Sequence, residues 1–384
     1  MHVGLSTGFA NHSNVEDNRF LREEMAQCLL AEELGFDSIW ITEHHFSEYS
    51  IAPSPLQYLT WLAGQTKHVR LGTQVVVVPW HDPVRLAEEI AVLDNLSGGR
   101  AIIGFGRGLA RMEYEGLRVD QSKARELFDE IVPMVMNAME TGFIEGGATF
   151  NQPRREIRPR PVRSLKGRAF CAAGTAASMV SAARLGLGRL YLGQPMVAGQ
   201  RRPFAPQTAA DSARANDEVA PEDAWLESWM ETRPDETPTA PFVSNLVFID
   251  DSADRAEELA RIYATKTFRA AIKNYELTSS HHGSIKGYES YKGLVMKEED
   301  VEKAMEGVVA SSVYGTPQQV LEKLDEVKRQ RDPQGMIPHL YTGGMPHDIA
   351  VRSMRIFARH CLKEMQSWQG ATSTIDPPMA KAAE

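Results

Sequence analysis

The chain has 384 residues, of which 42% are hydrophobic and 24% charged, and its formal net charge is −9. This composition is typical of a globular protein with a large core, and the scattered basic residues do not indicate a nucleic-acid-binding surface. No stretch reaches the ~18 consecutive apolar residues of a membrane span, and residues 1–18 do not resemble a secretion signal. Cys28, Cys171 and Cys361 fit neither a disulfide framework nor a zinc site. We therefore expect a cytoplasmic protein.

Apolar runs of strand length alternate with runs of helical periodicity along the whole chain. The expected strands cover residues 3–9, 37–42, 69–78, 100–105, 168–173, 188–192, 242–249 and 335–341. The expected helices cover residues 19–34, 54–67, 83–97, 121–140, 175–185, 252–273, 316–330 and 347–364. Four consecutive valines at 75–78 are typical of a parallel strand that is covered on both faces. Eight βα units in order predict an α/β fold, a closed (β/α)8 barrel of the TIM type.

The alternation is interrupted after the fourth, sixth and seventh strands. After the fourth, residues 143–160 contain the Gly and Pro residues of a hairpin. After the sixth, residues 200–240 are rich in Pro, Asp, Glu and Ala and are the expected insertion, helical around 222–230. After the seventh, residues 274–293 form a polar stretch with many turn residues. We expect one barrel domain over residues 1–365 and a flexible tail over residues 366–384.

Polar residues gather where three of the expected strands end. Glu43, His44 and His45 follow the second strand, His81 follows the third and Arg107 the fourth. Strand ends of one polarity lie on one face of such a barrel, and this face carries the chemistry. Adjacent side chains on a strand point in opposite directions, so His44 and His45 cannot share one small site. For the same reason these residues do not predict a metal centre, and the chain has no HExxH motif.

Several motifs together resemble one known family. They are EHHF at 43–46, LGTQVVVVP at 71–79, HDPVRLAEEIAVLDNLSGGR at 81–100, GFGRG at 104–108, GTPQQVLEKL at 315–324 and GGMPHD at 343–348. In this order they resemble the bacterial luciferase-like, flavin-dependent monooxygenases, and the resemblance lapses mainly over residues 200–240. It implies a homodimeric (β/α)8 barrel that receives reduced FMN from a separate flavin reductase. The enzyme would use O2 to oxygenate a small organic substrate such as an aldehyde, ketone or alkene.

The resemblance also implies where the FMN phosphate would bind. Arg107 and Arg125 match the family's phosphate contacts, and Gly174, Thr175 and Ser178 match its phosphate loop. Backbone N–H groups at a helix start, with hydroxyls one turn apart, favour a phosphate. Surface arginines and an ordinary threonine N-cap are the alternatives. The glycines of GFGRG do not have the spacing of a dinucleotide-binding fingerprint.

For the reactive end of the flavin, the resemblance implies a role for His44. An imidazole there would act as general base or stabilise the peroxide, since it titrates near neutral pH; a structural, hydrogen-bonded histidine is the alternative. A non-prolyl cis peptide between Gln74 and Val75 is implied beneath the flavin ring, against a plain trans strand. Gly106 replaces the reactive cysteine of light-emitting luciferase, so we expect no useful luminescence. Residues 274–293 fall where the family has a mobile lid, and a surface loop is the alternative.

Two other functions fit the same fold. One is hydride transfer with the deazaflavin F420, which needs no oxygen, and the other is flavin binding without catalysis. The EHHF motif argues against the first, because the F420 pocket would be expected to contain tryptophan. A non-catalytic relative would keep Arg107 and Thr175 but would not depend on His44. Because all three functions share one fold, the fold cannot decide between them.

Overall fold

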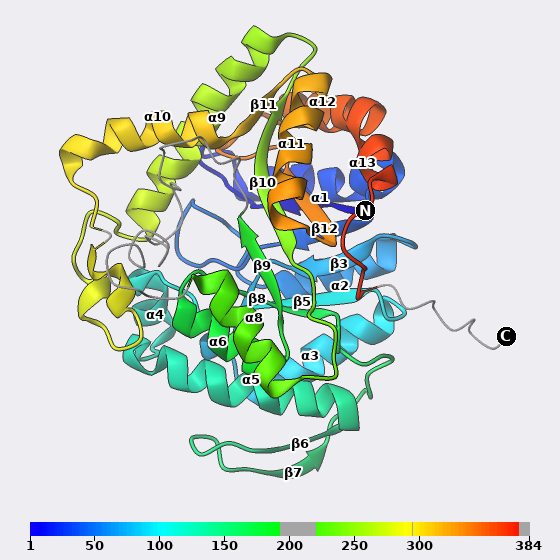
Figure 1. The fold of residues 1–384 in the computed structure, drawn as a ribbon, viewed down its shortest axis with the longest axis vertical. Coiled ribbons are helices and arrows are strands. Elements are labelled where there is room, and N and C mark those ends of the chain that lie inside the picture. The colour runs from blue at the N-terminus through cyan, green and yellow to red at the C-terminus, as the bar shows by residue number, and fades with distance from the viewer. Residues whose placement is uncertain (193–219, 294, 376–384) are drawn as a thin grey trace, which may run out of the picture.

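A parallel barrel forms the centre of the molecule. A computed structural model describes residues 1–192, 220–293 and 295–375 of the chain (Figure 1). Its barrel strands are β1 (His2–Thr7), β2 (Ser38–Ile41), β3 (Arg70–Thr73), β4 (Val76–Val77), β5 (Ala101–Gly106), β8 (Ala169–Ala172), β9 (Gly188–Leu192), β10 (Phe242–Ile249) and β12 (Gly335–His339). They pair in the order β1, β2, β3, β5, β8, β9, β10, β12 and back to β1, all parallel, while β4 continues β3 along β5. The predicted (β/α)8 barrel is therefore confirmed.

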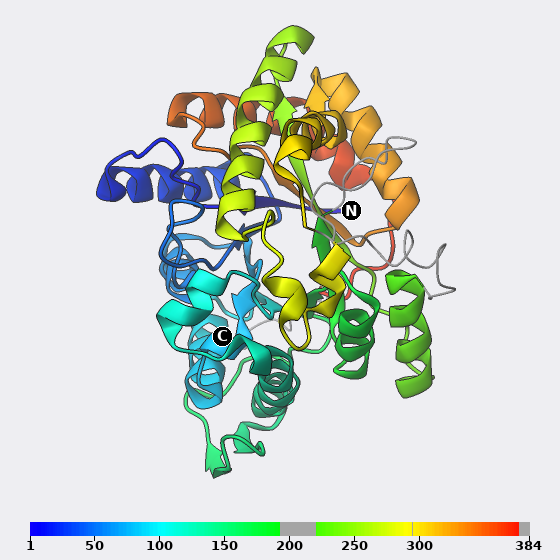
Figure 2. The same ribbon diagram turned by 90° about the vertical axis from the view of Figure 1, so that its left-hand side faces the viewer.

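Helices surround this barrel on the outside (Figures 1 and 2). Those in the positions expected from the sequence are α1 (Asp17–Leu34), α2 (Pro55–Gln65), α3 (Pro83–Leu96), α5 (Ala124–Thr141), α6 (Ala176–Arg184), α9 (Ala253–Asn274), α11 (Pro317–Arg331) and α12 (His347–Phe357). After α12 the chain continues through one π-helical turn into α13 (Lys363–Ser367). None of the described helices is long and apolar enough to cross a membrane.

Several elements differ from the expectation. The strand expected at 69–78 is divided into β3 and β4 at the Gln74–Val75 bond, which is cis. Two short helices, α4 (Arg111–Leu117) and α10 (Val301–Ser311), were not predicted, nor was β11 (Val313–Gly315), which pairs with β10. The expected hairpin is present as β6 (Phe143–Gly146) and β7 (Gln152–Glu156). These additions follow the fourth and seventh barrel strands.

The insertion after β9 is only partly described. Residues 200–219 of the predicted stretch lie outside the described residues. The expected helix is present as α8 (Pro221–Thr232), which packs against α6. Its Trp225 is fully buried, and the indole Nε1 donates to the carbonyl of Leu187 at 3.2 Å. Within the described residues, α8 therefore belongs to the outer helical layer of the barrel.

The end of the described chain packs into the barrel interior. Ile375 is fully buried in a cluster of inward-facing side chains that includes Trp40, Phe170 and Phe242. The preceding Thr374 donates its hydroxyl to the carbonyl of Gly167 at 2.7 Å. The sequence predicts a flexible tail over residues 366–384, but Thr374 and Ile375, within that range, pack against the barrel. Residues 376–384 lie outside the described residues.

Candidate active site

The predicted site residues follow the carboxyl ends of three barrel strands. His44 comes three residues after β2, Arg107 directly after β5, and Thr175 three residues after β8. In a closed parallel barrel these ends form one face. Figure 2 shows that the segment after α9, in yellow, lies over the same side of the barrel as the cyan and teal region that holds α4. Side chains from α4 and from this segment complete the site.

His44 is held by hydrogen bonds on both ring nitrogens. Its Nδ1 lies 2.9 Å from Oε1 of Glu113 on α4, and its Nε2 lies 3.2 Å from the hydroxyl of Tyr275, just after α9. Glu113 is 0% exposed and also accepts the backbone N–H of His45 at 2.8 Å. A third ring, Tyr49, meets His44 edge-on with ring centres 4.8 Å apart. An imidazole oriented by a buried carboxylate is suited to proton transfer.

His45 points away from His44, as predicted for adjacent residues. Its Nε2 lies 3.4 Å from Oε1 of the buried Glu43, and His81 Nε2 lies 2.9 Å from the same oxygen. The other Glu43 oxygen accepts the backbone N–H of Val77 on β4. Burial alone would raise the pKa of Glu43, but the hydrogen bonds from His45 and His81 lower it. This cluster therefore ties the chain after β2 to β4 and to His81.

Two arginines converge on one serine at the other end of the site. Arg125 Nη2 donates to Ser178 Oγ at 2.7 Å, and Arg107 Nη2 lies 3.5 Å from the same oxygen. Thr175 caps α6 and donates its hydroxyl to Ser178 at 2.9 Å. Gly174 immediately precedes this cap in the chain. The structure thus brings together the five residues predicted to bind phosphate.

The arginine pair has an excess of positive charge. Among the described residues no carboxylate lies within 4.0 Å of the Arg107 guanidinium, and Arg125 reaches only Asp129, at 4.0 Å. Burial, followed by the charge of Arg107, lowers the pKa of Arg125. A bound anion would offset both effects. Paired guanidinium groups next to a helix N-terminus are suited to a phosphate.

Two elements connect the arginine pair to His44. Helix α4 contributes Glu113 to His44, and its next residue, Tyr114, donates its hydroxyl to the backbone carbonyl of Arg107. The segment 274–293 contributes Tyr275 at one end and, at the other, the carbonyl of Gly287, which accepts from Arg107 Nη1 at 2.8 Å. The Arg107 guanidinium also lies 4.5 Å above the ring of Tyr288. The site is therefore one continuous set of contacts.

The cis bond between Gln74 and Val75 lies in the barrel wall between these two ends. Its presence excludes the plain trans strand in this structure. The Gln74 Oε1 accepts the hydroxyl of Ser6 on β1 at 2.9 Å. A side chain at Gly106 would meet Val75, since an added Cβ would lie 2.2 Å from Val75 Cγ2. The absence of a cysteine at position 106 therefore has a local steric reason.

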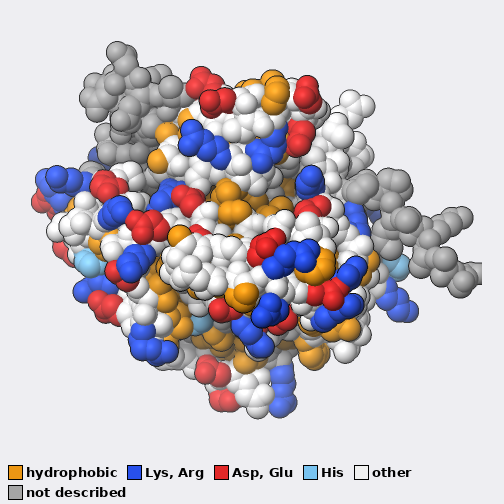
Figure 3. All heavy atoms as spheres, turned by 90° about the horizontal axis from the view of Figure 1, so that it is seen from below, with side chains coloured by type: hydrophobic (Ala, Val, Ile, Leu, Met, Phe, Trp, Pro, Cys, Tyr) orange, Lys and Arg blue, Asp and Glu red, His pale blue; other side chains and the backbone are white. Residues whose placement is uncertain are grey.

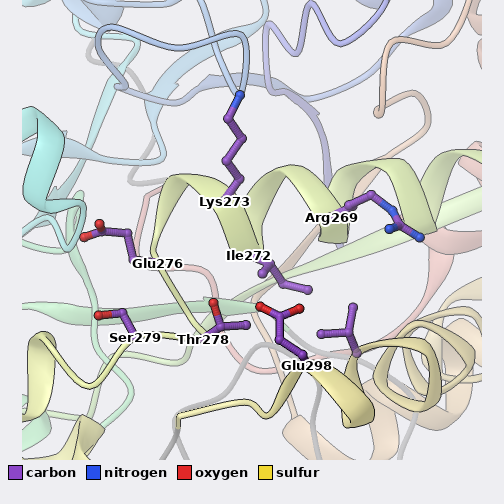
Figure 4. A pocket seen from close by; sticks show the side chains of 8 residues that line it. Arg269, Ile272, Lys273, Glu276, Thr278, Ser279 and Glu298 are labelled. Atoms are coloured by element: carbon purple, nitrogen blue, oxygen red, sulfur yellow. The ribbon is translucent and has the colours of Figure 1, made fainter.

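A pocket of 390 Å³ lies outside this site, between the end of α9 and the start of α10 (Figure 4). Its walls mix charges of both signs with Ile272 and Val301. Lys273 extends away from Glu298 and pairs with Glu48 at 2.8 Å. None of the residues predicted to form the site lines this pocket. Among the described residues there is also no group of three or more His, Cys, Asp or Glu arranged to hold a metal ion.

The match to a family model covers most of the chain. The model described as luciferase-like monooxygenase matches residues 1–332. The chain belongs to the luciferase-like monooxygenase family. The resemblance seen in the sequence motifs is thus confirmed. It places the chain in a family of flavin-dependent oxidoreductases. The fold is shared by an F420-dependent enzyme, so the fold alone does not name the flavin.

Among the relatives of this family member is the oxygenase component of a flavin-dependent trigonelline monooxygenase from Acinetobacter baylyi. It is 35% identical over 166 residues, which cover 42% of this chain and 46% of that protein. The alignment thus spans less than half of either chain. Two solved structures share the fold. The oxygenating constituent of 3,6-diketocamphane monooxygenase from Pseudomonas putida, in complex with FMN, has a TM-score of 0.68 at 15% identity, covering 97% of this chain and 99% of that one. An F420-dependent secondary alcohol dehydrogenase has a TM-score of 0.66 at 14% identity, covering 94% and 97%.

Sequence reasoning missed the residues that position the predicted ones. Glu113 and Tyr114 lie on a short helix between GFGRG and the next long helix, where RMEYEGL gives only a weak helical signal. Tyr275 lies within the polar stretch at 274–293, but no local pattern distinguishes it from the other tyrosines there. Their roles depend on contacts across 69 and 231 residues of chain. Only the folded structure reveals them.

Proposed function

We propose that the protein is the oxygenase of a two-component, flavin-dependent monooxygenase. It would take reduced FMN from a separate reductase and use O2 to oxygenate a small organic substrate, such as an aldehyde, ketone or alkene. The observation that carries this proposal is the convergence of Arg107 and Arg125 on Ser178 with little neutralising charge, connected through α4 to His44. One end of the site is suited to a phosphate and the other to proton transfer.

The residues present fit the two ends of FMN. Arg107, Arg125 and Ser178 would hold the phosphate, together with Thr175 and the backbone after Gly174. Gln74 and Val75 would lie beneath the ring, where Gly106 leaves room only for the Val75 side chain. The segment 274–293 contacts both ends of the site and would cover the bound flavin. The family match alone does not give these residue assignments, which are part of the proposal.

His44 would be the catalytic residue. When bound, reduced FMN supplies the two electrons with which O2 places one oxygen atom on the substrate and releases the other as water. His44 Nε2 would accept or return a proton at the reacting oxygen once that oxygen replaces the Tyr275 hydroxyl as its hydrogen-bond partner, while Glu113 orients the ring through Nδ1. The buried site would exclude water from this step.

A reductase partner is supported by a relative. The trigonelline enzyme is called an oxygenase component, and such a component implies a separate source of reduced flavin. In the described part of this chain, the barrel and its helices form no second nucleotide-binding domain. We therefore propose that reduced FMN arrives from another protein.

A homodimer is proposed from the exposed apolar residues of two neighbouring helices. Trp61 on α2 is 48% exposed, and Val92 and Leu96 on α3 are 36% and 61% exposed. Exposed apolar side chains on two helices that pack together are compatible with a protein interface.

On the face drawn in Figure 3, Lys and Arg are interspersed with Asp and Glu, so this face offers no tract for nucleic acid. Three buried free cysteines are compatible with a reducing cytoplasm.

The proposal is tested by an anaerobic titration with reduced FMN and, separately, with reduced F420. We expect reduced FMN to bind at least about tenfold more tightly, a difference of ~1.4 kcal/mol. Tighter binding of reduced F420 would overturn the proposal in favour of hydride transfer. Tight FMN binding with no reaction toward O2 would favour the non-catalytic flavin-binding protein.

A further inference from the structure

The hydrogen bonds of His44 define which nitrogen carries its proton. Glu113 Oε1 acts as an acceptor, since it receives the backbone N–H of His45, and His44 Nδ1 therefore donates to the same oxygen. In the neutral ring Nε2 is then the acceptor. The Tyr275 hydroxyl, 3.2 Å away, must be the donor to it. Carboxylate, imidazole and phenol thus form one chain of hydrogen bonds.

We propose that Tyr275 is a positioning residue for His44. By donating to Nε2, its hydroxyl fixes the orientation of the ring from the side opposite Glu113 and makes that orientation depend on the segment 274–293. This inference rests on the proposed role of His44 in oxygenation. It assigns to Tyr275 a function that neither the motifs nor the family match provides.

The surroundings of Tyr275 keep it a hydrogen-bond donor. Burial, followed by the charges of Tyr49 and Glu113, raises the pKa of Tyr275 well above its usual range. The phenol therefore keeps its proton at any pH at which the enzyme would work. Its ring also packs edge-on against Tyr49, with ring centres 5.3 Å apart, and Tyr49 in turn contacts His44. The three rings support one another.

The backbone at Tyr275 is held on both sides. Figure 4 shows its neighbours Lys273 and Glu276 projecting from the end of α9; Lys273 pairs with Glu48, and Glu276 pairs with Arg111 on α4. The backbone N–H of Tyr275 bonds to Ala271 at 2.9 Å, and its carbonyl lies 2.8 Å from Nε2 of His282. The hydroxyl is thus aimed at His44 by fixed main chain, as a positioning group requires.

The inference is tested first in the flavin-free protein by ¹⁵N NMR of the His44 ring, assigned through loss of its signals in His44→Ala. In Tyr275→Phe we expect the Nε2 signal to move toward that of an imidazole nitrogen without a hydrogen bond, while Nδ1 stays protonated. The matched control is Tyr263→Phe, which removes a hydroxyl from α9 in a separate hydrophobic cluster that does not include His44. An unchanged His44 spectrum in a folded Tyr275→Phe protein would overturn the inference.

A second readout separates positioning from simple stability. Tyr275→Phe should lower kcat by about three- to tenfold, as loss of one neutral hydrogen bond would, with reduced-FMN affinity unchanged. Equal kcat in Tyr275→Phe and wild type would contradict the positioning role. If the wild type oxygenates nothing, the proposed function fails, but the NMR comparison still decides whether Tyr275 holds His44. Thermal unfolding of each variant confirms that the folded states are compared.

Discussion

The Nδ1 atom of His44 lies 2.9 Å from the fully buried carboxylate of Glu113. This contact joins the end of β2 to α4, and the residue after Glu113 bonds to the backbone of Arg107. Helix α4 therefore links the histidine end of the site to the arginine end. A substitution at the arginine end should change flavin binding and spare the reaction with O2. A substitution at the histidine end should do the reverse.

His44→Ala should leave the affinity for reduced FMN within about twofold of wild type, because His44 contacts none of the arginine cluster. After mixing with O2, oxidised-flavin absorbance should return about tenfold faster in this variant than in wild type. The reason is that a hydrogen bond from His44 to the reacting oxygen would be lost. Stopped-flow absorbance measures both. His68→Ala, an exposed histidine, is the control. Identical traces for His44→Ala and wild type would make His44 structural.

Arg107→Ala should weaken binding of reduced FMN by about tenfold or more, since a charge-assisted hydrogen bond to the phosphate would be lost. Reduced riboflavin, which lacks the phosphate, should bind wild type and variant equally. Lys123→Ala removes an exposed cation near Arg125 and should change neither affinity. Equal losses for FMN and riboflavin would show that Arg107 acts on the fold rather than on the phosphate.

Glu24 predicts a pH effect on stability. Burial, followed by the charge of Glu23, raises the pKa of Glu24 to about 8. The folded chain keeps this proton while the unfolded chain releases it near pH ~4.3, so stability falls as pH rises from ~4.5 to about 8. Between pH 5 and pH 8, Glu24→Gln should gain on the order of 2–4 kcal/mol relative to wild type. Urea unfolding measures this, with Glu33→Gln, at an exposed position of the same helix, as control. Parallel pH profiles would refute it.

Ile375→Ala should destabilise the barrel by about 2–4 kcal/mol, as expected when a fully buried aliphatic side chain is truncated. Val162→Ala, at a side chain that is 52% exposed, should cost less than ~0.5 kcal/mol. Denaturant unfolding of the full chain compares the two. Equal stability of Ile375→Ala and wild type would mean that the chain end does not fill the barrel interior.

The barrel could be predicted because each βα unit carries its own local signals. Asp82 and Pro83 indicate a helix start, and in the structure Asp82 accepts the backbone N–H groups of Val84 and Arg85 at the start of α3. The break at Gln74–Val75 could not be read from periodicity, because an apolar run looks the same with a cis or a trans bond. The position of Ile375 depends on packing between the chain end and a barrel formed by earlier residues.

The site was predictable only in part for a related reason. Strand ends identified His44 and Arg107, and the motif resemblance added Arg125, Thr175 and Ser178, which the structure brings together. The groups that orient His44 come from α4 and from the end of α9, far away in the chain. Such pairings depend on tertiary structure and leave no pattern at the spacing of a helix or strand.

The central claim, that reduced FMN bound to this protein is used with O2, is tested most directly by rapid mixing. The anaerobic complex with reduced FMN is mixed with oxygenated buffer, and flavin absorbance and released H2O2 are followed beside free reduced FMN. Bound flavin should reoxidise by a course distinct from that of free flavin, with H2O2 released more slowly. Oxidation and H2O2 release identical to those of free flavin, or a complex inert to O2, would contradict it.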